Sequence, residues 1–323
     1  MKTITEIRQI LDTAVKEINF EKAPQGLYAP IEYILSLGGK RIRPALTLLA
    51  YNLFAEDVEK AVSPALGLEI FHNFTLLHDD IMDKADVRRG MPTVHKKWNE
   101  NTAILSGDVM QILAYQYMCQ VPAGDLKRVL EAFSQMAVEI CEGQQYDMEF
   151  ENREDVTADE YLDMIRLKTA VLLGTALKIG AWIAGADDRD AQALYDFGIN
   201  IGLAFQLKDD LLDVYGDEAT FGKKIGGDIL CNKKTYLLIH AKNLAKDREA
   251  DELNRWLHST KESQAKIDAV TALYNRLGVK KICEDKMDYF YDRAVASLDS
   301  VSVENVKKQE LVNLAKNLMS RKE

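Results

Sequence analysis

The distribution of proline constrains this chain more than any other feature. All six prolines lie at or before Pro122, and the 201 residues that follow contain none, whereas average usage of about 5% would place roughly ten there. Because proline costs about 3 kcal/mol inside a helix, such a stretch is typical of long helices. Segment 126–150 agrees, since its apolar residues recur at spacings of three and four, and sustained alternation of period two is almost absent from the chain. The sequence therefore predicts an all-α fold.

Glycine and proline positions divide this helical chain into segments. Glycine favours helix C-termini and proline favours the first helical turn. We therefore expect helix ends at Gly185, Gly216, Gly226–Gly227 and Gly278, and helix starts near Pro44 and Pro64. The sequence contains no linker rich in serine or proline, no shift in composition and no short repeat. We expect one domain over residues 1–323.

The charge balance limits the kind of partner. The chain has 41 Lys plus Arg against 51 Asp plus Glu, a net charge of −10. This balance argues against broad electrostatic binding to nucleic acid or to an anionic membrane. Any anionic ligand must therefore meet local basic clusters or metal ions, and we expect no nucleic-acid partner.

Cysteine usage and the N-terminus indicate the compartment. The four cysteines form no CxxC pair, which excludes a zinc knuckle and a dense disulfide framework. The first 18 residues read as an amphipathic helix, not as a charged start followed by an apolar segment. The longest uncharged stretch, 109–124, carries three Gln and a Pro, so we expect no membrane span. These features favour a reducing cytoplasm.

Two acidic clusters of the same pattern, DDxxD, follow apolar helical segments. In the first, the apolar run from Leu66 ends in His78 and then Asp79, Asp80 and Asp83; in the second, a similar run ends in Asp209, Asp210 and Asp213. The first and last carboxylates of each cluster are separated by four residues, which places them on one helix face about 6 Å apart along the axis. The two copies lie 130 residues apart.

Such clusters need a compensating charge. Like charges four residues apart destabilise a helix, and neighbouring apolar runs add a desolvation cost. A single DDxxD is commonly a solvated helix face, because short motifs match by chance. Two copies on apolar helices favour magnesium, a hard cation that takes oxygen ligands and shares its coordination with substrate phosphates.

Three basic segments supply candidate anion clamps. The first, Gly38-Gly39-Lys40-Arg41-Ile42-Arg43-Pro44, packs three cations into four positions, and Arg88-Arg89-Gly90 follows the first acidic cluster. The third includes Gly222-Lys223-Lys224 and then Lys233-Lys234-Thr235. It is not a Walker loop, because no Ser or Thr follows the lysine at the required spacing. Guanidinium groups bind phosphate oxygens through two parallel hydrogen bonds, so these segments indicate binding of an anion.

Six motifs stand in the order of a known family. They are GGKRIRP, LLHDDIMDKADVRRG, GQQYD, KTA, FQLKDDLLD and GKKIGGDI, and the match runs from about Gly38 to Thr235. The chain closely resembles the trans (all-E) isoprenyl diphosphate synthases, also called polyprenyl synthetases. The resemblance implies the all-α isoprenoid synthase fold, a helical bundle around a deep central cavity, and a homodimer.

The resemblance also implies roles for individual residues. Asp79, Asp83 and Asp209 would hold three magnesium ions against the diphosphate of an allylic substrate. The side chains implied to bind its oxygens are Arg88, Lys168, Thr169, Gln206 and one of Lys223 and Lys224, with Lys233 as a further substrate-binding residue. A second subsite, for isopentenyl diphosphate, would comprise Lys40, Arg43, His72 and Arg89. The implied catalytic set is Asp79, Asp80, Asp83, Asp209, Asp210, Lys168 and Gln206, while Gln144 and Asp147 belong to the GQxxD element beside the cavity.

The reaction implied by the resemblance is a condensation. Magnesium and basic side chains stabilise the departing diphosphate of dimethylallyl, geranyl or farnesyl diphosphate, so that the allylic carbon becomes cation-like. The double bond of isopentenyl diphosphate attacks this carbon, and loss of a proton leaves a chain five carbons longer. The released diphosphate takes the proton in this family, so no side chain is assigned as a base.

Other readings account for fewer of these residues. The pair His78-Asp79 is typical of HD-type metal phosphohydrolases, which need further metal-binding His and Asp residues; this leaves the second cluster without a role. A class I terpene cyclase shares the fold, but it carries an Asn/Ser/Glu motif in place of a second DDxxD. An inactive partner subunit of a heteromeric synthase is disfavoured because no acidic ligand is missing.

Residues just before the first cluster bear on product length. Phe74 and Phe71 lie about 7.5 Å and 12 Å from Asp79 along a helix axis, where both rings can face one wall. In the family, an aromatic residue five positions before the first Asp, without an insertion in the motif, is typical of geranylgeranyl diphosphate synthases. Farnesyl synthases of the animal type add an aromatic residue where this chain has Thr75. We expect a product of twenty carbons, with farnesyl diphosphate as the alternative.

Overall fold

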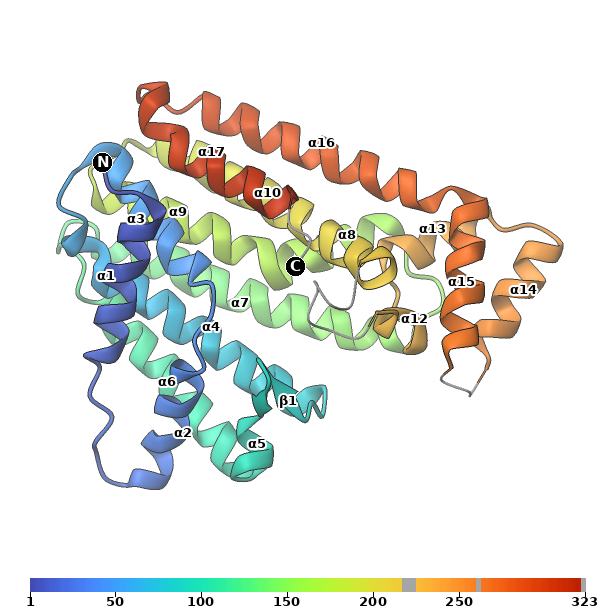
Figure 1. Ribbon diagram of the computed structural model, residues 1–323. Helices are drawn as coiled ribbons and strands as arrows, with labels where there is room; N and C mark the ends of the chain where they lie inside the picture. Colours follow the sequence, from blue (N-terminus) through green and yellow to red (C-terminus); the bar gives the residue numbers. More distant parts are fainter. Residues whose placement is uncertain (217–224, 260–262, 321–323) are drawn as a thin grey trace. The chain divides into compact units, whose positions relative to one another are not determined.

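The chain is built almost entirely of helices, as the spacing of apolar residues and the lack of proline predict. A computed structural model describes residues 1–216, 225–259 and 263–320, and Figure 1 shows its course. Among these described residues, one small sheet pairs two strands of two residues, β1 (Val87–Arg88) and β2 (Met91–Pro92). The all-α prediction is confirmed.

The helices follow one another with short connections. Those before the middle of the chain are α1 (Ile4–Lys16), α2 (Gln25–Ser36), α3 (Ile42–Phe54), the 3₁₀-helix η1 (Val58–Ala61), α4 (Val62–Met82), α5 (Val94–Lys97), α6 (Glu100–Met118) and α7 (Leu126–Glu151). Those after it are α8 (Ala158–Ile165), the π-helix η2 (Arg166–Ala170), α9 (Val171–Ile183), α10 (Asp188–Tyr215), α12 (Gly227–Leu230), α13 (Tyr236–Leu244), α14 (Arg248–Leu257), α15 (Gln264–Leu277), α16 (Val279–Asp299) and α17 (Asn305–Ser320). None of these described helices is both long enough and apolar enough to span a membrane.

The chain forms two compact units, and each is assembled from separate stretches of sequence. The first comprises Met1–Ser134, Thr175–Tyr195 and Val301–Leu311, and the second comprises Gln135–Gly174, Asp196–Ser300 and Val312–Glu323. The first acidic cluster therefore belongs to the first unit and the second cluster to the second unit.

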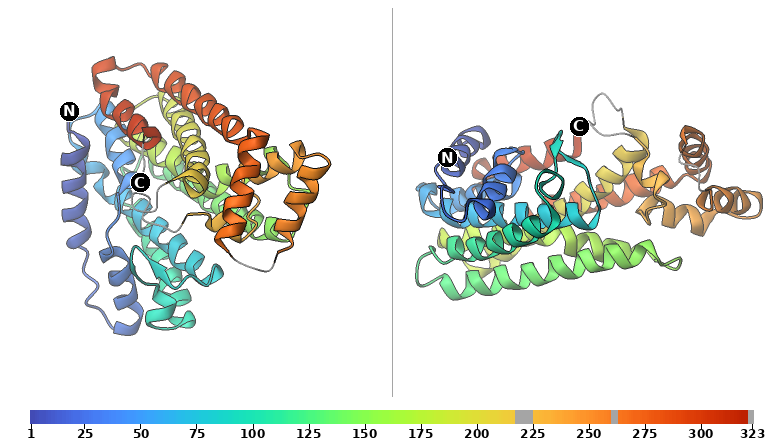
Figure 2. Two further views of the ribbon diagram at one scale, coloured as in Figure 1. Left: turned by 45° about the vertical axis from the view of Figure 1, so that its right-hand side comes forward. Right: turned by 90° about the horizontal axis from the view of Figure 1, so that it is seen from below.

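The first unit is organised around an antiparallel pair of helices, α4 and α6, which lie side by side in Figures 1 and 2. Glycines let their backbones approach closely. A Cβ on Gly67 would lie 3.0 Å from the Ala114 carbonyl oxygen, and a Cβ on Gly107 would lie 2.3 Å from Nε2 of His78. The end of α4 that carries the acidic cluster is thus packed against the start of α6.

Most helix ends fall where the sequence predicts them, but Gly226–Gly227 begin α12 instead of ending a helix. Pro44 and Pro64 lie in the first turns of α3 and α4, where the missing N–H costs no helical hydrogen bond. Gly226 and Gly278 have positive φ angles of 81° and 71° and stand at the start of α12 and between α15 and α16. The predicted helix over 126–150 is α7, which extends one residue further.

The core of the second unit is a single apolar cluster. It joins residues from α10, α13, α15 and α16, including Leu207, Leu238, Leu273 and Cys283. Figure 1 shows α14 and α15 side by side within this unit. The apolar stripe of α10 therefore fixes the helix that presents the second acidic cluster.

Candidate active site

The first acidic cluster closes helix α4, and its three carboxylates have different surroundings. Asp83 follows the last residue of the helix and donates its backbone N–H to the Asp79 carbonyl at 2.8 Å, so the predicted spacing of one turn is confirmed. Asp79 is half-buried and Asp83 is exposed. Asp80 is only 2% exposed. Burial raises the pKa of Asp80, and the neighbouring Arg88 guanidinium partly offsets this effect.

A tight hairpin brings Arg88 to this cluster. Strands β1 and β2 pair with Arg88 opposite Met91, and the two turn residues, Arg89 and Gly90, have φ angles of 53° and 77°. Two consecutive left-handed residues are typical of a type I′ turn. Arg88 donates through Nε to both oxygens of Asp80, at 2.8 and 2.9 Å, and through Nη2 at 2.7 Å. Asp80 therefore holds the Arg88 side chain in place.

The second acidic cluster, on α10, repeats this arrangement with a different partner. Asp210 is 7% exposed and accepts a hydrogen bond of 2.6 Å from the hydroxyl of Tyr161 on α8. Burial, reinforced by Asp228, raises the pKa of Asp210 to about 8. Asp213 accepts a hydrogen bond of 3.0 Å from the backbone N–H of Asp228, and burial raises its pKa to about 6. In both clusters the second aspartate faces the protein interior, while the first is half-buried.

The carboxylates of the two clusters suit magnesium. Mg²⁺ is usually held by one or two carboxylates, with waters and substrate phosphates completing its coordination. In residues 1–216, 225–259 and 263–320, no His, Cys, Asp or Glu side chains form a group of three or more that could hold a metal ion. Asp79 and Asp83 lie one turn apart, and Asp209 and Asp213 stand at the same spacing on α10. These pairs of hard oxygen donors match the ligand preference of magnesium.

The basic groups of the first unit gather around His72. Burial, together with Arg43 and Arg89, lowers the pKa of His72 well below its usual value, so the imidazole is neutral at pH 7. Burial also lowers the pKa of Arg43 to about 10, an effect that Glu69 partly offsets. The Nε of Arg43 is buried and makes no hydrogen bond among the described residues. Lys40 is exposed. The group therefore carries a surplus of positive charge, which favours an anion.

Arg41 departs from the expectation that all three cations of this segment bind an anion. Its side chain turns inward, is 6% exposed and forms an ion pair of 2.5 Å with Glu69 on α4. Arg41 therefore serves the fold of the segment, while Lys40 and Arg43 remain candidates for ligand binding.

In the second unit, the residues of the GQxxD and KTA motifs meet directly. Lys168 and Thr169 lie in the π-helix η2, a form of turn that is frequent at functional sites. The Lys168 ammonium donates to Asp147 Oδ2 at 2.6 Å. Burial raises the pKa of Asp147, but Lys168 and Lys233 outweigh burial and lower it overall. A Cβ on Gly143 would lie 2.3 Å from the Lys168 backbone nitrogen, so glycine is what lets α7 approach the π-turn.

The remaining members of these motifs are partly accessible. Gln144, Thr169 and Gln206 are half-buried, and Lys233 is exposed. Lys223 and Lys224 lie outside the described residues, so the choice between them stays open.

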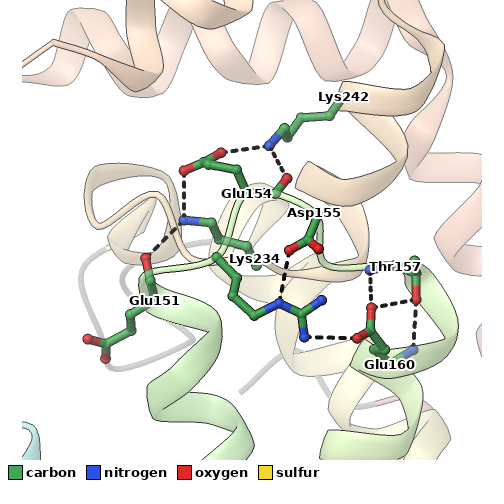
Figure 3. Close-up of polar contacts among 8 residues, drawn as sticks. Glu151, Glu154, Asp155, Thr157, Glu160, Lys234 and Lys242 are labelled. Carbon is green, nitrogen blue, oxygen red and sulfur yellow. Dashed lines mark hydrogen bonds and ion pairs between the residues drawn. The ribbon is translucent and has the colours of Figure 1, made fainter.

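The two lysines of the pair Lys233–Lys234 have separate surroundings. Lys234 donates to the Glu151 carbonyl at 3.1 Å and pairs with Glu154 at 3.5 Å. Glu154 is also bound by Lys242 of α13, at 2.7 Å, and Figure 3 shows this carboxylate between the two ammonium groups. Lys234 is thus engaged at the end of α7.

Lys233, in contrast, acts on the acidic residues. Its ammonium opposes the effect of burial on the pKa of Asp147, Asp210 and Asp213. Of the two lysines, Lys233 is therefore the one that acts on the second acidic cluster, and its role in substrate binding stays a prediction.

The aromatic residues expected to limit product length pack together in the first unit. Phe71 and Phe74 have ring centroids 5.5 Å apart, and Phe71 also meets Phe133 of α7 at 5.2 Å. The rings of Phe74 and His78 meet edge to face, with centroids 4.8 Å apart. Thr75, one position later, donates its hydroxyl to the His72 carbonyl at 2.8 Å. The two rings of Phe71 and Phe74 thus lie on one face of α4, and their role in limiting product length stays a prediction.

Three residues of these networks were missed by sequence reasoning. Glu69 is the one charged residue between Val62 and Leu77, and a lone carboxylate in an apolar helix is a signal for a buried partner. Tyr161 carries no such signal, because its partner lies 49 residues away. Gly143 belongs to the GQxxD motif, but the sequence does not reveal that it packs against the backbone of Lys168.

Comparisons with known proteins agree with this arrangement. A family model described as polyprenyl synthetase matches residues 24–274. The chain belongs to the polyprenyl synthetase family. A geranylfarnesyl diphosphate synthase of Natronomonas pharaonis is 37% identical over 98% of this chain and 96% of its own length. A geranylgeranyl diphosphate synthase of Methanosarcina mazei is 42% identical over 72% of each chain. A crystal structure of a geranylgeranyl pyrophosphate synthase covers 100% of both chains with 44% identity and a TM-score of 0.94.

These findings confirm the family, the isoprenoid synthase fold and the enzyme class predicted from the sequence. The polyprenyl synthetase is a short-chain prenyltransferase. The terpene cyclase and HD-type phosphohydrolase readings are not favoured, because the matching relatives are prenyl diphosphate synthases.

The separate surroundings of Lys233 and Lys234 generate a prediction. Lys233→Met should weaken binding of magnesium pyrophosphate at least about tenfold, since a charge-assisted contact contributes roughly 1.5–3 kcal/mol. Lys234→Met should change that affinity less than about threefold, but it should lower the melting temperature by about 2 °C, because it removes an anchor of α7. Isothermal titration calorimetry and thermal unfolding measure the two effects. Equal loss of affinity in both variants would contradict the assignment.

Proposed function

We propose that this synthetase condenses isopentenyl diphosphate with allylic diphosphates, namely dimethylallyl, geranyl and farnesyl diphosphate, and that its main product is geranylgeranyl diphosphate. The observation that carries the proposal is the shared design of the two acidic clusters, each with a buried, protein-bound second aspartate and further carboxylates one turn apart. Relatives named geranylgeranyl diphosphate synthase support the product. Farnesyl diphosphate is the alternative product.

Each basic group has a proposed ligand. Asp79, Asp83 and Asp209 would hold magnesium, of which three ions are expected, and the metal would supply positive charge to the diphosphate leaving group. The residues proposed to bind the oxygens of the allylic diphosphate are Arg88, Lys168, Thr169, Gln206, Lys233 and one of Lys223 and Lys224. Those proposed to bind isopentenyl diphosphate are Lys40, Arg43, His72 and Arg89, and the buried Nε of Arg43 supports this subsite.

The protein's part in the reaction is electrostatic. The bond between the allylic carbon and the diphosphate oxygen breaks as Lys168 and Arg88 stabilise the charge that develops on the leaving group. The isopentenyl double bond supplies the electron pair for the new carbon–carbon bond. A proton then leaves the adjacent carbon for the released diphosphate. Asp80 holds Arg88 in position, and Asp147 holds Lys168. Tyr161 binds Asp210 and so positions the second acidic cluster.

Both units belong to the proposed single domain. The family match over residues 24–274 includes stretches of each unit, and the unit boundaries fall inside continuous helices such as α7 and α10. The reducing cytoplasm remains the proposed compartment, on the basis of the four cysteines, which form no disulfide among the described residues.

Loss of a metal-binding carboxylate should abolish most of the activity. Asp79→Ala and Asp209→Ala should each lower the condensation rate by about two orders of magnitude or more, because a few kcal/mol of charge stabilisation are lost. Incorporation of radiolabelled isopentenyl diphosphate measures the rate, and circular dichroism checks the fold. Asp57→Ala, which removes an exposed carboxylate paired with Lys60, is the matched control and should stay within about twofold. Near-normal turnover of Asp79→Ala would refute the magnesium assignment.

Product length should depend on the aromatic wall of α4. Phe74→Ala removes the ring nearest the acidic cluster and should shift the products upward by one or more five-carbon units. Phe71→Ala, one turn further back, should leave the product unchanged while Phe74 is present, and the double variant should make longer chains than Phe74→Ala alone. Chromatography of the dephosphorylated products measures the distribution. An unchanged product from Phe74→Ala would place the floor elsewhere, for instance on α6.

We also propose that the chain forms a homodimer through α6. Leu105 and Ile112 are each 58% exposed and stand seven residues apart, on one helix face. Exposed apolar stripes of this kind mark association surfaces.

Charge on this stripe should therefore disrupt the dimer. Light scattering should give twice the chain mass of 36.5 kDa for the wild type and a single chain mass for Leu105→Asp/Ile112→Asp. Val306→Asp alters an apolar residue that is 71% exposed on α17 and should leave the dimer intact. A wild type that is monomeric at micromolar concentration would disprove the proposal.

A further inference from the structure

The segment that carries Lys40 and Arg43 has an unusual backbone. Gly38, Gly39 and Arg41 have positive φ angles of 75°, 143° and 48°. Glycine adopts such angles without strain, but for arginine the left-handed conformation is uncommon and must be held by other contacts. Contacts with other parts of the protein must therefore hold Arg41 in this conformation.

Arg41 supplies that contact at one end of the segment. Its Nη1 donates to Glu69 Oε1 at 2.5 Å and its Nη2 donates to the Leu35 carbonyl at 2.8 Å. Glu69 Oε1 also accepts a bond of 3.1 Å from Asn73 Nδ2. The side chains of Arg41 and Glu69 are 6% and 3% exposed, so this ion pair is buried within the network.

Arg89 braces the other end. It donates a hydrogen bond to the Gly38 carbonyl, and a Cβ on Gly39 would lie 2.9–3.2 Å from three guanidinium atoms of Arg89. The segment thus lies between two arginines. Of the two, Arg89 is proposed to bind isopentenyl diphosphate, whereas Arg41 is paired with Glu69.

Glu69 is a carboxylate that interacts with Arg41, Arg43 and Arg89. It raises the pKa of both Arg43 and Arg89, against the effect of burial. Glu69 therefore attracts the two guanidinium groups that are proposed to bind isopentenyl diphosphate. In the present arrangement Arg41 neutralises this carboxylate at hydrogen-bond distance. Without Arg41, a buried and unneutralised Glu69 would draw Arg43 or Arg89 toward itself, since an uncompensated buried charge is strongly unfavourable.

We propose that Arg41 is a positioning residue that binds Glu69 and never the substrate. It fixes the 38–41 segment, and it keeps Arg43 and Arg89 available for the diphosphate of isopentenyl diphosphate. The inference rests on the proposed function of that subsite and adds to it a residue with a separate role. It predicts that the effect of losing Arg41 depends on whether Glu69 is charged.

Two pairs of single and double variants test this dependence. Arg41→Met should raise the KM for isopentenyl diphosphate at least about tenfold, with kcat and the KM for the allylic substrate within about twofold, because the defect is confined to one subsite. Arg41→Met/Glu69→Gln removes the buried carboxylate as well, and it should return the KM to within about threefold of the wild type. The matched pair is Arg43→Met and Arg43→Met/Glu69→Gln, in which a direct ligand is lost and no rescue is expected.

The outcomes separate the inference from the proposed function. If the folded Arg41→Met/Glu69→Gln variant keeps a KM raised tenfold or more, Arg41 does not act by neutralising Glu69 and the inference is refuted. Should Arg41→Met alone fail to fold, the double variant, which buries neither charge, decides the question by the same threshold. If the wild type neither turns over isopentenyl diphosphate nor binds it by calorimetry, the proposed function fails and the positioning role falls with it. Rescue in the Arg41 pair but not in the Arg43 pair supports the inference.

Discussion

The geometry of both acidic clusters depends on the burial of their second aspartate. A carboxylate placed among apolar side chains must find a partner, because an isolated buried charge is too costly. Asp80 finds the Arg88 guanidinium and Asp210 finds the Tyr161 hydroxyl. Each contact fixes the rotation of its helix, so the neighbouring Asp79 or Asp209 is turned toward the less buried side. The inward aspartate is therefore what orients the outward one.

The same division of labour recurs among the cations. Arg41 is buried against Glu69 while Lys40 is exposed, and Lys234 is anchored at Glu151 and Glu154 while Lys233 acts on the acidic cluster. In each pair one residue makes a structural contact within the protein, and its neighbour is left for the proposed binding of ligand. Adjacent residues on a chain point in different directions, which is why a doubled motif can serve both purposes at once.

Close helix packing sets the distances that these contacts require. Gly143 lets α7 reach the backbone of the π-turn, and Asp147 on the same helix then meets Lys168 at 2.6 Å. Gly107 gives the His78 ring its place against α6, beside the acidic end of α4. A side chain at either glycine would push the helices apart, since packed interiors adjust only partly to added volume. The hydrogen bonds of the site therefore depend on these two glycines as well as on the side chains that form them.

The sequence by itself determined the helices and the chemistry of the site. Proline and glycine positions and the apolar spacing predict α4, α7 and most helix ends, because these depend on local backbone preferences. The two DDxxD clusters and the basic motifs are also local patterns, and they suffice to identify the family and the candidate residues.

Only the tertiary structure decided which member of each motif faces inward. Helical spacing places Asp79 and Asp83 on one face, but it does not reveal that Asp80 meets Arg88 or that Arg41 meets Glu69. Those choices depend on partners from other segments, such as Tyr161, which lies 49 residues from Asp210. The pairing is set by the burial of the whole unit, because a buried charge binds whichever partner the packing brings within reach. The local sequence does not determine which distant residue the packing brings close. The role of each residue within a motif could therefore be assigned only from the fold.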